Sequence, residues 1–336
     1  MTGNFARTVK AMNKKYCYNI SALVVLSIFM LVNLSSVSNA EILKNLDCNP
    51  QAIKSPIQKG LAIVGELSGF DPCNSSVELF RPNTRDNPPI VIVAHGGGGK
   101  RDAQNITREF QKLGFGTLIF DAYEMNGIPL GRIGNASRQM MILKTTYAAY
   151  EWILKRSDFN TSAIYFYGIS NGASVVINIA GMVDKNHVKG IISEAPTPTG
   201  IGYPNEISIP IQIIFGELDD LGAPVGKKRW EIQDLCRISV SFDFAPKGTS
   251  KDCNYKTADK SKRSISTIDW TKSVIKTQSS FIDIVFIENM AHGGFTKELN
   301  INTRDFGRGP IGWSEGGTPD SRNKMLEVIN QFIKKL

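Results

Sequence analysis

The sequence is poor in the residues that most often bind metal ions. It contains 3 histidines and 5 cysteines among 336 residues, and no C-x-x-C or H-E-x-x-H pattern joins them. Protein zinc sites usually draw their ligands from such patterns. We therefore expect no metal site in this chain.

Basic residues are also not gathered into a surface for nucleic acid. The formal net charge of +8 falls to +4 when residues 1–40 are set aside, because that segment holds four basic residues and no acidic one. No basic cluster alternates with aromatic side chains. This distribution predicts no nucleic-acid partner.

Long hydrophobic runs are missing apart from one near the N-terminus. Four basic residues precede an apolar run over about 20–34, and small or polar residues follow up to Ala40. This order is typical of a secretory signal peptide, with cleavage after Ala40. An uncleaved membrane anchor is the alternative, but the run is short for a span and Asn33 interrupts it. We expect an exported protein, periplasmic or secreted, without a membrane span after cleavage.

Cysteine usage agrees with export. Four cysteines follow the signal segment, namely Cys48, Cys73, Cys236 and Cys253. An even number of cysteines in an exported chain favours disulfides over free thiols. Of the three possible pairings we expect the local one, Cys48–Cys73 and Cys236–Cys253. Each bond closes a loop of about 20 residues, which the chain-entropy model values at about 3 kcal/mol.

After the signal segment, apolar strands alternate with helices. The expected strands are 77–80, 90–94, 116–121, 163–167, 188–193, 209–215 and 281–287. The expected helices are 102–113, 137–156, one running from the serine motif toward Gly181, 226–237, and a closing helix after Thr318. This alternation predicts an α/β fold, with a mostly parallel central sheet and helices on both faces.

No linker divides this region, so we expect one catalytic domain over 41–336. Residues 41–75 are expected to form an extended lead-in, and 122–136 a glycine-rich loop. A polar segment at about 246–280, rich in lysine and serine, is expected as an insertion held at its base by Cys236–Cys253.

The most informative motif is Gly168-x-Ser170-x-Gly172, which directly follows the apolar residues 163–167. A serine between two glycines, at a sharp turn from strand to helix, is the pattern of an exposed nucleophile. The glycines lack a Cβ that would clash with the crowded backbone there. A second match around Ser314 has no strand before it and no helix after it, so we select Ser170.

A serine nucleophile needs a base, and the base needs an orienting acid. His292 follows the last core strand, at the sheet edge where the serine motif also ends, so it is the expected base. His95 precedes the serine and is expected to be structural. His187 lies at the opposite edge and is expected to have a surface role.

The acid is expected after a strand that lies between the serine and the histidine. Asp219 directly follows the 209–215 strand and is preferred, to hold the histidine tautomer. Asp220 is the near alternative, and Glu194, at the end of the preceding strand, is the more distant one.

An oxyanion hole needs two N–H donors. We expect one from Asn171, directly after the serine, and one from Gly97 in the glycine turn after the 90–94 strand, with Gly96 or Gly98 as alternatives. A phosphate loop at the same turn is disfavoured, because Ala94 and Arg101 stand where glycine and Ser or Thr are required.

These motifs resemble the α/β-hydrolase superfamily, and most closely its dienelactone-hydrolase-related branch. The matching segments are 93–99, 168–173, 216–220 and 291–295, which span about 200 residues in the family's order. The resemblance implies the α/β-hydrolase fold and Ser170, Asp219 and His292 as the triad. Typical dienelactone hydrolases carry cysteine at the nucleophile position, so Ser170 indicates a serine esterase or related hydrolase.

The sequence therefore predicts an exported serine hydrolase that cleaves a small-molecule carboxylic ester through an acyl-enzyme and needs no cofactor. The alternatives are a peptidase or amidase on the same triad, and a non-catalytic binding protein of the same fold. Substrate-lining residues are expected from the loops 122–136, 196–208 and 246–280, where Tyr123, Tyr203 and Trp270 are candidates.

Overall fold

The computed structural model describes residues 40–42, 69–83, 86–127, 135–197, 203–204, 207–231, 270–272, 281–305, 307 and 309–336. The chain divides into two units, residues 1–39 and Ala40–Leu336. The first unit, which carries the predicted signal peptide, lies outside the described residues. The second unit contains every element discussed below.

The centre of this unit is an eight-stranded sheet in the order β1-β2-β4-β3-β5-β6-β7-β8. The strands are β1 (Ala40–Ile42), β2 (Glu78–Pro82), β3 (Ile90–Ala94), β4 (Gly116–Ile119), β5 (Ile164–Ile169), β6 (Val188–Glu194), β7 (Ile211–Gly216) and β8 (Ile282–Ile287). Strand β2 pairs antiparallel with both β1 and β4, and the strands from β4 to β8 are parallel. The carboxyl ends of the parallel strands therefore meet at one edge.

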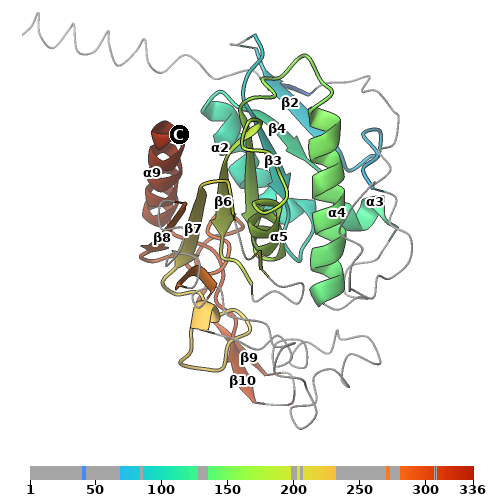
Figure 1. Cartoon of the computed structure of the whole chain (residues 1–336). Coiled ribbons are helices and arrows are strands. Elements are labelled where there is room, and N and C mark those ends of the chain that lie inside the picture. The colour runs from blue at the N-terminus through green and yellow to red at the C-terminus, as the bar shows by residue number, and fades with distance from the viewer. Residues whose placement is uncertain are drawn as a thin grey trace, which may run out of the picture. The chain divides into compact units, whose positions relative to one another are not determined.

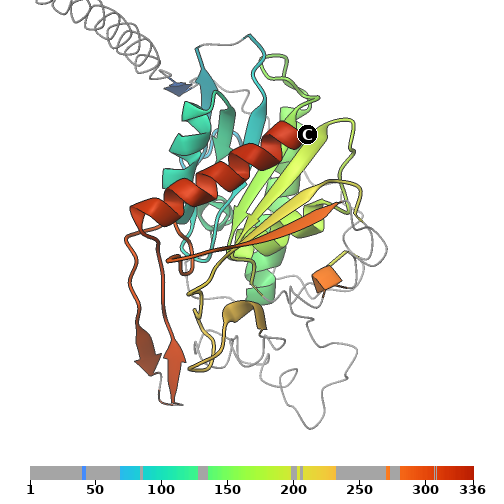
Figure 2. The ribbon, with the colours of Figure 1, turned by 90° about the vertical axis from the view of Figure 1, so that its left-hand side faces the viewer.

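Helices cover both faces of the sheet (Figure 1). Helices α4 (Asn135–Ile153) and α5 (Asn171–Ile179) pack on one face, together with the short α3 (Ala122–Met125). Helices α2 (Gln104–Lys112) and α9 (Pro319–Lys335) lie on the other, where α9 crosses the strands diagonally (Figure 2). All five residues of β3 are buried, as expected for a central strand covered on both sides.

The predicted fold class is confirmed, and most predicted elements are present within a few residues of their expected ends. The closing helix begins as the sequence indicates: the Thr318 hydroxyl accepts the Ser321 N–H and Pro319 occupies the first turn. The helix expected over 102–113 is preceded by a 3-10 turn, η2 (Lys100–Ala103).

The prediction of a loop over 122–136 is wrong at both ends, where the structure has helices. Residues Ala122–Met125 form α3, whose first turn is capped by the Asp121 carboxylate through the N–H groups of Tyr123 and Glu124. Helix α4 begins at Asn135. The cap explains α3, because a carboxylate that accepts two free N–H groups stabilises even a single helical turn.

Two further expectations need correction. The helix expected over 226–237 is represented in the described residues only by the 3-10 turn η3 (Arg229–Glu231). Strand β1 lies within the expected lead-in, and a hairpin of β9 (Thr303–Asp305) and β10 (Pro310–Gly312) was not expected. Each of these three strands is only three residues long, too short for an alternating pattern to appear.

The insertion expected at about 246–280 lies outside the described residues except for 270–272. There Trp270 is buried, stacks on Tyr203 with ring centroids 4.8 Å apart, and donates from Nε1 to the Pro204 carbonyl. Among the described helices, none is long and apolar enough to cross a membrane.

Of the cysteines, only Cys73 is described. Its sulfur is disulfide-bonded. Cys48, Cys236 and Cys253 lie outside the described residues, so the pairing stays a prediction.

Candidate active site

Ser170 stands on a strained turn between β5 and α5. Its φ of 56° and ψ of −115° lie in a region that non-glycine residues rarely adopt. A Cβ at Gly168 would lie 2.2 Å from the Gly172 carbonyl oxygen, and one at Gly172 would lie 2.2 Å from the Ala94 carbonyl oxygen. Both motif glycines are therefore required by close backbone approach, and the Ser170 side chain is left at the carboxyl edge of the sheet.

His292 and Asp219 are hydrogen-bonded to each other. Asp219 follows β7, His292 follows β8, and His292 Nδ1 lies 2.9 Å from Asp219 Oδ2. Both side chains are buried. An ionised carboxylate only accepts hydrogen bonds, so this contact holds the proton of a neutral His292 on Nδ1.

The other ring nitrogen of His292, Nε2, is buried and has no hydrogen-bond partner among the described residues. With the proton held on Nδ1, Nε2 carries the lone pair. His292 Nε2 is therefore a basic nitrogen on the side of the ring that does not contact Asp219, and no described group donates a hydrogen bond to it.

Asp220, the alternative acid, and Ser314, the alternative serine, are hydrogen-bonded to each other and not to His292 side-chain atoms. Asp220 Oδ1 accepts the Ser314 backbone N–H at 2.8 Å. Ser314 is itself buried, and its hydroxyl accepts the Asn302 N–H. Of the two neighbouring aspartates, Asp219 is the one that contacts His292.

The glycine turn after β3 lies against the serine. A Cβ at Gly96 would be 3.2 Å from the Ser170 Cβ, and one at Gly97 would be 3.5 Å from Asn171 Nδ2. The Gly98 N–H donates to Asp102 Oδ2 at 2.7 Å, so this donor is already used. The structure thus brings Gly97 and Asn171 together beside Ser170.

Asp102 is a residue that the sequence did not single out. Burial raises the pKa of its carboxyl group, whereas the Gly98 N–H and the nearby His95 and His292 lower it. It lies in η2, just before α2, and holds the glycine turn through its bond to Gly98. No spacing rule marks such a residue in advance.

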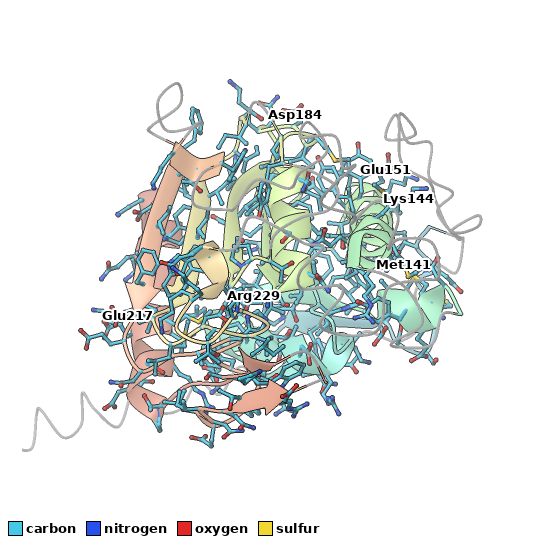
Figure 3. The ribbon with its side chains drawn as sticks, turned by 90° about the horizontal axis from the view of Figure 1, so that it is seen from below. Met141, Lys144, Glu151, Asp184, Glu217 and Arg229 are labelled. Atoms are coloured by element: carbon cyan, nitrogen blue, oxygen red, sulfur yellow. The ribbon has the colours of Figure 1, made fainter. Side chains whose placement is uncertain are left out.

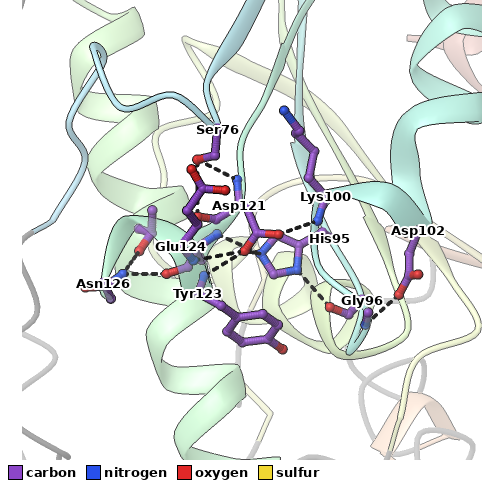
Figure 4. Close-up of polar contacts among 12 residues, drawn as sticks. Ser76, His95, Gly96, Lys100, Asp102, Asp121, Tyr123, Glu124 and Asn126 are labelled. Atoms are coloured by element: carbon purple, nitrogen blue, oxygen red, sulfur yellow. Dashed lines mark hydrogen bonds and ion pairs between the residues drawn. The ribbon is translucent and has the colours of Figure 1, made fainter. Parts of the chain in front are cut away.

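His95 makes structural contacts, in agreement with the expectation. It is fully buried; Nδ1 donates to the Gly96 carbonyl at 2.7 Å, and Nε2 accepts the Ala122 N–H at 2.8 Å (Figure 4). Burial lowers the pKa of its imidazole against the opposing effect of Asp121. A neutral His95 with both nitrogens engaged ties the glycine turn to the start of α3.

His187, the third histidine, lies at the amino end of β6, away from the carboxyl edge. Its Nδ1 contacts the Thr161 carbonyl at 2.9 Å.

Glu194 joins the nucleophile to the histidine loop. Its backbone carbonyl accepts the Ser170 N–H at 2.9 Å, and its Oε1 accepts the Gly294 N–H at 2.7 Å. Its Oε2 accepts the hydroxyl of Tyr167. Burial raises the pKa of this carboxyl group, in opposition to the hydrogen bonds from Tyr167 and Gly294. The sequence offered Glu194 only as a remote alternative acid, and the structure places it between Ser170 and the His292 loop.

Arg229 is a second buried charge that the sequence did not reveal. Its N–H donates to the Asp219 carbonyl at 2.9 Å, and its guanidinium donates to the Leu221 carbonyl. Burial lowers the pKa of Arg229, whereas Asp219 raises it. Arg229 is buried and is labelled near the middle of the view in Figure 3, whereas the exposed Glu217 lies at its edge. A buried cation thus stands near the acid.

The site offers no grouped metal ligands within the described ranges: no three His, Cys, Asp or Glu side chains are placed to hold an ion.

No family model matches the chain. An uncharacterized protein of Mycobacterium tuberculosis is 31% identical over 93 residues, which cover 27% of this chain and 31% of that protein. The quorum-quenching protein AidA of Acinetobacter baumannii is 27% identical over 131 residues, which cover 37% of this chain and 41% of AidA. The chain therefore matches less than half the length of these curated relatives.

Among solved structures, the chain is similar to dienelactone hydrolase from Anabaena variabilis, with a TM-score of 0.41 and 16% identity over 65% of this chain and 81% of that one.

The architecture of the chain itself is specific. Its sheet has the order β1-β2-β4-β3-β5-β6-β7-β8 with β2 antiparallel, and a strained serine turn joins the central β5 to its helix. The chain has the α/β-hydrolase fold.

Proposed function

We propose that this chain is an exported serine hydrolase that cleaves a carboxylic ester through an acyl-enzyme. Ser170 is the nucleophile, His292 the general base and then acid, and Asp219 the residue that orients His292. Asn171 and Gly97 supply the N–H donors that bind the oxyanion.

The arrangement of His292 carries the proposal. One ring nitrogen is hydrogen-bonded to the buried Asp219, and the other is buried without a partner among the described residues. A buried nitrogen without a hydrogen-bond partner lowers the stability of the folded protein, so its presence indicates a role in function. Accepting and returning the Ser170 proton is such a role, and the bond to Asp219 stabilises the imidazolium that results.

The backbone at Ser170 supports the same role. The positive φ places the serine at the tip of the turn, and α5 begins at the next residue, Asn171. The N-terminus of a helix carries a partial positive charge and free N–H groups, which favour developing negative charge.

The proposed reaction has two halves. Ser170 Oγ attacks the ester carbonyl as its proton passes to His292 Nε2; the tetrahedral intermediate then collapses and His292 protonates the departing alcohol. Water attacks the acyl-enzyme with His292 again as base, and Ser170 is released with the acid product. Atoms and protons balance without a further reactant.

Export and the disulfide pairs belong to the same proposal. The disulfide at Cys73 agrees with an oxidising compartment. The proposal includes removal of residues 1–40 and the pairs Cys48–Cys73 and Cys236–Cys253. Intact mass of the protein purified after export tests the cleavage, and mass spectrometry of its proteolytic peptides, before and after reduction, tests the two pairs.

A fluorophosphonate tests the nucleophile. The wild type and the variants Ser170→Ala and Ser314→Ala are each treated, and their intact masses are recorded. We expect one adduct on the wild type and on Ser314→Ala, and none on Ser170→Ala. A folded wild type that takes no adduct would sink the triad and favour the non-catalytic binding protein. Comparison of an ester with the matching anilide then separates an esterase from an amidase.

A further inference from the structure

Tyr123 lies beside the proposed oxyanion site and has no part in the mechanism above. It is the second residue of α3, is 3% exposed, and its ring packs against His95 with centroids 4.9 Å apart. Figure 4 shows its hydroxyl pointing away from the Asp121 contacts that hold the start of α3. The ring is fixed by packing, and the hydroxyl can donate a hydrogen bond to a bound ligand.

The Tyr123 hydroxyl is buried and has no hydrogen-bond partner among the described residues. Burial has the largest effect on the pKa of Tyr123 and raises it, so the hydroxyl keeps its proton. The polar side chains around it are Arg138 and Asn171, which lower its pKa, and Asp102, which raises it. A buried tyrosine normally finds a partner for this group. A hydroxyl left unsatisfied next to a nucleophile is a donor available to a ligand.

The amide of Asn171 is turned so that its donor side faces the same place. Its Oδ1 accepts hydrogen bonds from Thr197 Oγ1 at 3.2 Å and Gln139 Nε2 at 3.4 Å. Its Nδ2 is therefore directed to the glycine turn, 3.5 Å from where a Cβ of Gly97 would stand. Arg138 Nη1 is 3.8 Å from that same position. The donor groups of Asn171 and Arg138 thus gather on the Gly97 side of Ser170, whereas the Asp102 carboxylate is engaged by the Gly98 N–H.

We propose that Tyr123 Oη and Asn171 Nδ2 form a subsite for an oxygen acceptor carried on the acyl group next to the ester carbonyl, as in an alkoxyacetyl or hydroxyacetyl ester. This inference rests on the proposed function. The carbonyl oxygen is held by the N–H groups of Gly97 and Asn171, and an oxygen on the adjacent carbon lies beside it when the two C–O bonds are eclipsed. The subsite therefore adds a specificity for the acyl part of the substrate.

The reason for selectivity is the cost of leaving these donors unpaired. A site built to hydrogen-bond a substrate oxygen discriminates against the analogue that lacks it, because the buried donors then have no partner. An alkyl acyl chain of the same length offers no acceptor to these donors.

Two nearly isosteric esters test the subsite, 4-nitrophenyl methoxyacetate and 4-nitrophenyl butyrate. Each kcat/KM is divided by the rate constant for hydrolysis by hydroxide, which removes the intrinsic reactivity of the ester. We expect the normalised ratio of methoxyacetate to butyrate to be well above one for the wild type. In Tyr123→Phe we expect that ratio to fall about tenfold, the effect of one hydrogen bond.

Tyr147→Phe is the matched control, because Tyr147 lies on α4 and packs its ring against Tyr150. It should keep the wild-type ratio. Tyr123→Phe loses only a hydroxyl without a partner, so its thermal midpoint should equal or exceed that of the wild type.

If Tyr123→Phe leaves the normalised methoxyacetate-to-butyrate ratio unchanged, the subsite is refuted. This includes the case in which the rates for both esters fall equally. A normalised wild-type ratio at or below one overturns the subsite as well, whatever the variant does. Fluorophosphonate labelling separates failure of the subsite from failure of the proposed function. If the wild type is labelled and one of these two results is found, only the subsite is refuted. If the wild type is not labelled, the proposed function is refuted as well.

Discussion

His292 Nδ1 and Asp219 Oδ2 lie 2.9 Å apart, although 73 residues separate the two in the chain. Asp219 is held in place by the N–H of Leu221, which donates to its other oxygen, and by the Arg229 N–H, which donates to its carbonyl. The acid is therefore held by contacts of its own in addition to the one with His292.

We predict that Asp219→Asn lowers kcat on the order of 10³- to 10⁴-fold. An amide can present an NH₂ group to Nδ1, which favours the tautomer with its proton on Nε2 and removes the base. The measurement is steady-state hydrolysis of a short 4-nitrophenyl ester, with the rate of fluorophosphonate labelling as a second readout.

Asp220→Asn is the control for this variant. Asp220 accepts the Ser314 N–H, which an amide oxygen also accepts, so we expect rates close to the wild type. Equal losses in the two variants would show that the assignment of the acid is mistaken.

A second prediction concerns Gly172. A Cβ there would lie 2.2 Å from the Ala94 carbonyl oxygen and 2.5 Å from that of His95, both in the backbone of the neighbouring chain segment. We expect Gly172→Ala to lower the free energy of unfolding by about 4 kcal/mol or more, because neither atom can move aside cheaply. Urea unfolding followed by circular dichroism measures this.

Gly114→Ala provides the comparison. A Cβ at Gly114 would meet nothing within 4 Å, but its φ of 83° makes alanine strained. We expect a loss of about 1 to 2 kcal/mol. If both substitutions cost the same, close approach is not what requires glycine at position 172.

The third prediction uses the pKa of Glu194, which burial raises above the ordinary value of 4.5. Below pH 4.5 the group is protonated in both the folded and the unfolded protein. As the pH rises from 4.5 toward the raised folded pKa, the unfolded chain ionises while the folded protein keeps Glu194 protonated, so the folded state loses stability; the loss levels off above the folded pKa. We expect Glu194→Gln to gain stability relative to the wild type as pH increases from about 4 to about 8.

Urea unfolding of both proteins across this range isolates Glu194, because all other titrating groups are common to the two. Glu217→Gln, at the exposed edge seen in Figure 3, should run parallel to the wild type. A constant difference between Glu194→Gln and the wild type over the whole range would contradict a raised pKa.

The fourth prediction concerns the buried Arg229. Arg229→Met leaves the Leu221 carbonyl without its donor and removes the cation beside the buried Asp219. We expect the free energy of unfolding to fall by about 3 kcal/mol, since the buried Asp219 loses the opposite charge near it. Arg108→Met, on the exposed side of α2, should change it by less than about 0.5 kcal/mol. If Arg229→Met and Arg108→Met change the free energy of unfolding by similar amounts, the burial of Arg229 does not determine its contribution to stability.

The sequence predicted best what depends on local pattern. The continuous apolar run of β3 and the cap and proline at the start of α9 are properties of neighbouring residues, and both elements formed where expected. Helix α3 had a local signal that was overlooked, because Asp121 with Glu124 three residues later is the pattern of a capping box.

Other features had no local signal. A glutamate is almost never fully buried without a partner, and the partners of Glu194 are Tyr167, 27 residues before it, and Gly294, 100 residues after it. The direction of the Tyr123 hydroxyl likewise depends on His95 and Asn171, which come from other elements. Such contacts exist only once the sheet has brought distant segments together.

Among the described strands, β8 pairs only with β7 and so forms one border of the sheet. His292 follows this strand, whereas Ser170 follows the central β5. A border strand is the part of a sheet that detaches at the lowest free energy, without unfolding the rest. Detachment of β8 would carry the base away from a nucleophile that stays in place, so opening of this one border is enough to take the site apart without unfolding of the domain.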